Sequence, residues 1–110
     1  MTRVRIDTSR LGRDIYITGH CRNEGDSPAE APLVCAALTA LAQTVAQNVY
    51  DSEDTGDTDI IDVTLKSGQA IISYVTDDER LNTAVDGICK GFYMLAENYP
   101  EYVECYSKEG

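Results

Sequence analysis

The chain has 110 residues, of which 43% are hydrophobic and 25% charged, a composition ordinary for one soluble globular domain. Its formal charge is −10, from 19 acidic and 9 basic residues, which argues against nucleic-acid binding because contacts to phosphate require lysine and arginine. No run approaches the roughly 18 apolar residues of a membrane span, and the first seven residues lack a signal-peptide core. We therefore expect one cytoplasmic domain over residues 1–110. The acidic charge either attracts a basic polypeptide or only keeps the protein soluble.

The first part of the chain predicts two strands and a loop. Residues 3–7 alternate polar and apolar side chains, the period of a half-buried strand. Residues 9–13 form a hairpin turn, and a second strand over residues 14–20 ends at His20. Residues 21–31 are polar and contain glycine, serine and proline, which is typical of a loop.

A long helix is expected from Pro32 to Tyr50. Proline suits the first helical position, where its missing N–H costs nothing, whereas a start at the capping-box pattern Ser27-x-x-Glu30 would place proline inside the helix. This start places Cys35 in the first turn. The apolar stripe of the helix consists of Val34, Leu38, Leu41, Val45 and Val49.

The second half predicts two strands, a helix and a last strand after an acidic loop at residues 51–59. Strands are predicted at residues 60–65 and 70–75, joined by a hairpin. A helix then begins at the capping box Thr76-x-x-Glu79 and ends before Pro100, and residues 102–106 form a last strand. The apolar stripe of this helix consists of Leu81, Val85, Ile88, Phe92, Leu95 and Tyr99.

The element order is therefore ββαββαβ. We expect an α/β two-layer sandwich, with a mixed sheet of about five strands and two helices on one face. The other face of the sheet is either solvated or a dimer contact. Its predicted residues include Tyr16, Thr18, Thr64 and Ser73.

The four cysteines contain no C-x-x-C pair, and in the cytosol we expect them reduced. Only His20 and Cys21 are close in sequence, and neighbouring strand residues point to opposite faces, so no metal site and no cofactor is expected. Cys89 and Cys105 fall in a helix and a strand, where packing in the core is the expected role. Cys21 falls in the loop, where exposure would allow its thiol to react or to be oxidised.

His20 and Cys35 form the candidate catalytic pair. A thiol with the ordinary pKa of about 8.5 is mostly protonated at neutral pH, and an adjacent imidazole can take its proton. N–H groups of a first helical turn could stabilise an oxyanion beside Cys35. Such a pair would carry out acyl transfer, most simply peptide hydrolysis. The alternative is that Cys35 is a packed hydrophobe and His20 is incidental.

The segment from Gly19-His20 through Leu33-Val34-Cys35-Ala36-Ala37-Leu38-Thr39-Ala40-Leu41 resembles the ribosomal-processing cysteine protease (Prp) family. By that resemblance His20 matches the catalytic histidine and Cys35 the nucleophile. The family implies a homodimeric bacterial α/β protein that removes a short N-terminal extension from a large-subunit ribosomal protein. A basic substrate of that kind suits the acidic chain.

Two positions depart from the family's motif. The aspartate three residues before the cysteine is Pro32 here, and the alanine after the histidine is Cys21. Acidic side chains occur nearby, but none occupies the matching position. They are Glu24, Asp26 and Glu30.

These departures keep two alternatives open. One is a phage-type paralogue that processes capsid or scaffold proteins, and the other is a non-catalytic homodimeric binding module of the same fold.

Overall fold

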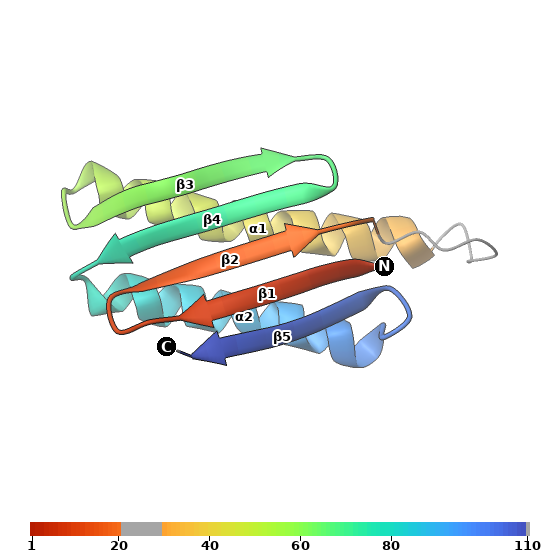
Figure 1. Ribbon diagram of the computed structural model, residues 1–110. Helices are drawn as coiled ribbons and strands as arrows, with labels where there is room; N and C mark the ends of the chain where they lie inside the picture. Colours follow the sequence, from red (N-terminus) through yellow and green to blue (C-terminus); the bar gives the residue numbers. More distant parts are fainter. Residues whose placement is uncertain (21–29, 110) are drawn as a thin grey trace.

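The structure is a computed structural model that describes residues 1–20 and 30–109 (Figure 1). Its elements follow the order ββαββαβ, as the sequence predicts. The bounds are β1 Thr2–Thr8, β2 Gly12–Thr18, α1 Glu30–Asp54, β3 Thr58–Lys66, β4 Gln69–Thr76, α2 Glu79–Asn98 and β5 Val103–Glu109.

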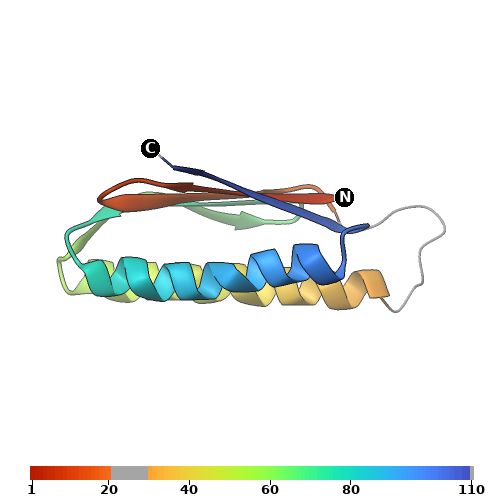
Figure 2. The same ribbon diagram turned by 90° about the horizontal axis from the view of Figure 1, so that it is seen from below.

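The five strands form one mixed sheet in the order β3-β4-β2-β1-β5. The β1–β5 pair is parallel and the other pairs are antiparallel. The register places apolar residues opposite one another: Val4 pairs with Ile17, and Ile15 pairs with Ile72. Both helices lie on one face of the sheet (Figure 2), which confirms the predicted two-layer sandwich.

The core lies between the sheet and the two helices. Val45 on α1 and Phe92 on α2 are fully buried, as are Ile15 and Ile72 on the sheet. Each such side chain contributes about 1.5–3 kcal/mol by leaving water. The predicted stripes of both helices therefore face the core and fix how the helices lie on the sheet.

The bounds of α1 differ from the prediction at both ends. The helix begins at Glu30 rather than Pro32, and it ends at Asp54 rather than Tyr50. Pro32 is tolerated two positions inside because the first turn of a helix has no partners for its N–H groups. Cys35 consequently lies in the second turn, and the α-helical pattern pairs its N–H with the carbonyl of Ala31. The expected first-turn position of Cys35 was therefore wrong. Ser27 lies outside the described residues.

By length and composition alone α1 is long and apolar enough to cross a membrane, in contrast to the expectation from the sequence. Buried core helices of soluble proteins can have the same length and apolar composition. Here α1 lies along the sheet, and its buried positions recur with helical periodicity. They are Ala31, Val34, Leu38, Ala42, Val45, Ala46 and Val49.

Helix α2 begins with a different cap from the one predicted. Asp78 is the N-cap, and its side chain accepts a hydrogen bond from the N–H of Arg80. Thr76 instead ends β4, where its hydroxyl is buried, accepts from the Thr58 hydroxyl and donates to the carbonyl of Asp57. The Thr76 hydroxyl also accepts the N–H of Asp78, so this network ties the β3–β4 edge of the sheet to the start of α2.

Candidate active site

His20 follows β2 at the point where the chain leaves the sheet. The N–H of Gly19 donates to the carbonyl of Gly68 at 3.0 Å, which extends the β2–β4 pairing by one residue beyond Thr18 and Gln69. Gly19 has φ of 98°, a left-handed conformation that a glycine adopts without strain. The side chain of His20 is exposed.

Cys35 lies on the half of α1 that covers this end of the sheet. Its neighbours in the helix, Val34 and Leu38, are buried against the core, whereas Cys35 is only partly buried. Its carbonyl accepts a hydrogen bond from the hydroxyl of Thr39 at 2.9 Å. The thiol is therefore at the border between the core and the surface.

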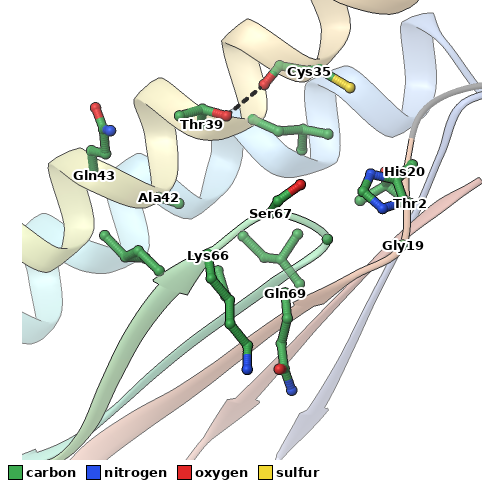
Figure 3. A pocket seen from close by; sticks show the side chains of 15 residues that line it. Thr2, Gly19, His20, Cys35, Thr39, Ala42, Gln43, Lys66, Ser67 and Gln69 are labelled. Carbon is green, nitrogen blue, oxygen red and sulfur yellow. Dashed lines mark hydrogen bonds between the residues drawn. The ribbon is translucent and has the colours of Figure 1, made fainter.

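A pocket of about 470 Å³ contains both residues in its lining (Figure 3). It lies among α1, the end of β2 and the β3–β4 hairpin. In Figure 3 Cys35 and His20 lie toward the same end, while Gln43 lies toward the other. Its apolar lining consists of Ile17, Leu38, Ala42, Leu65 and Ala70. Apart from His20 and Cys35, Lys66 is the one ionisable side chain among the described lining residues.

The two candidate catalytic residues thus share one pocket, as the sequence hypothesis requires. Among the described residues, no hydrogen bond joins the imidazole to the thiol. In a free enzyme the hydrogen bond between a catalytic base and its nucleophile is often long, and it tightens when substrate binds. The lack of this bond between the two described residues is therefore compatible with a catalytic pair.

Of the three acidic residues near Cys35, only Glu30 lies among the described residues. The hydroxyl of Tyr102 donates to Glu30 Oε2 at 3.5 Å, and Tyr102 is itself buried. Glu30 therefore joins the start of α1 to the segment before β5. Glu24 and Asp26 lie outside the described residues.

The other described cysteines have surroundings that suppress their reactivity. Burial, more than the nearby Asp86 carboxylate, raises the pKa of the Cys89 thiol to about 12. Burial also raises the pKa of Cys105 to about 11. Both pack against the core, as the sequence predicts. Cys21 lies outside the described residues, and within residues 1–20 and 30–109 no cluster of three metal-ligating side chains occurs.

Sequence reasoning missed the β3–β4 hairpin as part of the site. Its residues Lys66, Ser67, Gly68 and Gln69 line the pocket, although they are more than 40 positions from His20 in the sequence. The sequence identifies the hairpin but not its neighbour, because only the pairing of β4 with β2 places its turn beside His20.

The family model described as cysteine protease Prp matches residues 1–104. The chain belongs to the Prp family. None of the curated proteins compared with the chain matches it. The Prp assignment therefore depends on the family model, and it confirms the resemblance inferred from the segment around His20 and Cys35.

Solved structures agree with this fold. The crystal structure of SMU.848 from Streptococcus mutans is 20% identical, with a TM-score of 0.70, over 100% of this chain and 96% of that one. Two structures of the essential ribosomal processing protease Prp from S. aureus cover 98% of this chain and 100% of theirs. The complex with a covalently linked product peptide is 19% identical with a TM-score of 0.66. The complex with a substrate peptide is 16% identical with a TM-score of 0.59.

Proposed function

We propose that this Prp-family protein is a cysteine endopeptidase in which Cys35 is the nucleophile and His20 the general base. The observation that carries the proposal is that the chain's single histidine and Cys35 line one pocket. The two other described thiols are held protonated by burial.

The proposed reaction proceeds in two acyl-transfer steps. His20 takes the thiol proton of Cys35, and the thiolate attacks the peptide carbonyl carbon to form a tetrahedral oxyanion. The C–N bond breaks, the imidazolium returns the proton to the leaving amine, and a thioester forms on Cys35. Water, deprotonated by His20, then hydrolyses the thioester and restores the thiol.

We assign no oxyanion stabilisation to first-turn N–H groups, because Cys35 lies in the second turn of α1. Because α1 begins at Glu30, the N–H of Cys35 is paired within the helix. The dipole of α1 still presents its positive end on the side of the pocket, but this effect weakens beyond the first turn.

The proposed substrate is the N-terminal extension of a large-subunit ribosomal protein precursor, in a bacterial cytoplasm. Support comes from the family and from the ribosomal processing role named for the S. aureus protease. The apolar part of the pocket fits an uncharged side chain beside the scissile bond. The charge of −10 attracts a basic precursor at long range. Because the pocket itself contains Lys66, we assign any preference for basic protein to the wider surface.

We further propose a homodimer that uses the sheet face opposite the helices. Tyr16 of β2 lies on this face, where Arg5 of β1 is 5.8 Å from the centre of its ring. Tyr106 is exposed on β5, at the position paired with Arg5. Aromatic and arginine side chains of this kind are enriched at protein interfaces.

One observation favours a second candidate function. Pro32 stands where the family's motif has aspartate, which favours a non-catalytic binding module of the same fold. A paralogue that processes phage capsid or scaffold proteins is the corresponding alternative for the substrate.

The test is cleavage of an N-terminally extended ribosomal protein precursor by the wild type, Cys35→Ala and His20→Ala. Cys105→Ser is the matched control, because it removes a thiol that lies outside the pocket. A specific cut that disappears in the first two variants and persists in the control supports the proposal. No cut by the wild type on this precursor would refute the substrate assignment. Equal cleavage by Cys35→Ala would refute the nucleophile.

A further inference from the structure

We propose that Gly68, in the turn of the β3–β4 hairpin, is the positioning residue for the His20 imidazole. The catalytic consequence rests on the proposed function, in which His20 is the base. The contact itself stands on geometry alone. Nothing in the motif around Gly19-His20 and Cys35 points to this residue.

The His20 ring occupies the space that a side chain at position 68 would fill. A Cβ atom built on Gly68 would lie 2.8 Å from His20 Nε2 and 3.0 Å from Cε1. Cβ atoms essentially never show contacts under 3.0 Å, so the ring would have to move. The imidazole edge that carries Nε2 therefore packs against the bare backbone of Gly68.

Gly68 also fixes the backbone just before His20. Its carbonyl accepts the N–H of Gly19 at 3.0 Å, directly beyond the last β2–β4 pair, Thr18 with Gln69. One residue of the hairpin thus contacts both the backbone just before His20 and the edge of its ring. Among the described residues the ring makes no hydrogen bond, so packing against Gly68 limits its rotation.

A competing explanation is that the turn alone requires glycine, because Gly68 has φ of 78°. Gly56 provides a matched control for this explanation. It has φ of 86° in the turn between α1 and β3, and a Cβ there would meet nothing within 4 Å. Gly68→Ala and Gly56→Ala therefore carry similar backbone strain, but only the first displaces His20.

The first measurement is catalytic. In Gly68→Ala we expect kcat/KM for precursor cleavage to fall about 10- to 100-fold, because misplacing a catalytic group by about 1 Å can cost that much in rate. The fall should be mainly in kcat, and the pH profile should change. In Gly56→Ala we expect little change in kcat/KM, although both variants lose a similar amount of thermal stability. An equal effect of the two substitutions on kcat/KM would overturn the catalytic consequence.

The second measurement does not depend on activity. Because the chain has one histidine, the imidazole protons of His20 are identifiable by NMR in the intact protein. We expect a nuclear Overhauser effect between the ring and the Gly68 α-protons in the wild type, and ring resonances that shift in Gly68→Ala but not in Gly56→Ala. Absence of the effect would overturn the contact even if the protease is active. Its presence in a protein that cleaves nothing would refute only the proposed function.

Discussion

Two glycines one turn apart on α2 provide a direct test of how the helices pack. A Cβ at Gly91 would lie 2.8 and 2.9 Å from the two methyl carbons of Leu41 on α1, whereas a Cβ at Gly87 would meet nothing within 4 Å. Because α1 carries Cys35, this contact also bears on the position of the proposed nucleophile.

The two alanine substitutions should have different effects on stability. Gly87→Ala should raise the free energy of unfolding by about 0.8–1 kcal/mol, the difference in helix propensity between the two residues. Gly91→Ala gains the same amount, but Leu41 must move by about 1 Å to restore ordinary contact distances, and overpacking costs about 1–3 kcal/mol. We therefore expect Gly91→Ala to be about 1–3 kcal/mol less stable than Gly87→Ala.

Urea unfolding of the two variants and of the wild type measures this difference. The control is a Leu41→Ala background, which removes the methyl groups that Gly91→Ala would meet. In this background Gly91→Ala should become stabilising by about the same 0.8–1 kcal/mol as Gly87→Ala. Equal stabilisation by Gly87→Ala and Gly91→Ala with Leu41 intact would contradict the close contact between Gly91 on α2 and Leu41 on α1.

Two further predictions concern thiols and an ion pair. Since burial raises the pKa of Cys89 to about 12 and of Cys105 to about 11, from 9.0, their thiolate fractions at neutral pH fall about 1000- and 100-fold. Iodoacetamide should therefore label Cys35 before Cys89 and Cys105 in the folded protein, and early labelling of Cys89 would contradict this. Asp86→Asn weakens a bidentate pair with the nearly buried Arg13, at 2.7 and 2.9 Å. Because Asp86 is 50% exposed, we expect a loss of about 1–2 kcal/mol in urea unfolding; unchanged stability would show that the pair contributes nothing.

Periodicity was enough to predict the elements and the two-layer architecture. Every strand and helix was anticipated, because apolar residues recur at two-residue spacing near Ile15 and at helical spacing near Val45 and Phe92. The strand order was not predicted, since alternation shows which face of a strand is buried but not which strand lies beside it.

The errors at helix ends have local causes. Proline at position 32 was read as the first helical residue, although any of the first positions tolerates a missing N–H. Thr76 fitted a capping box by sequence, but its hydroxyl is used between Thr58 and Asp57, and Asp78 caps α2 instead. The tolerance of the first helical turn explains the first error, and the contacts of Thr76 explain the second.

The candidate site was predicted only in part. His20 and Cys35 were recognised because each lies near the end of a regular element and within a segment that resembles the Prp family. The contribution of Gly68 was invisible in the sequence, because it depends on the pairing of β4 with β2, which brings the hairpin turn beside His20.

The central claim is that His20 takes the proton of Cys35. The most direct test is the rate of Cys35 alkylation as a function of pH, in the wild type and in His20→Ala. We predict faster alkylation of the wild type at neutral pH and equal rates at high pH, where the thiolate forms without help. Superimposable profiles at every pH would contradict the pair and leave the binding module as the better description.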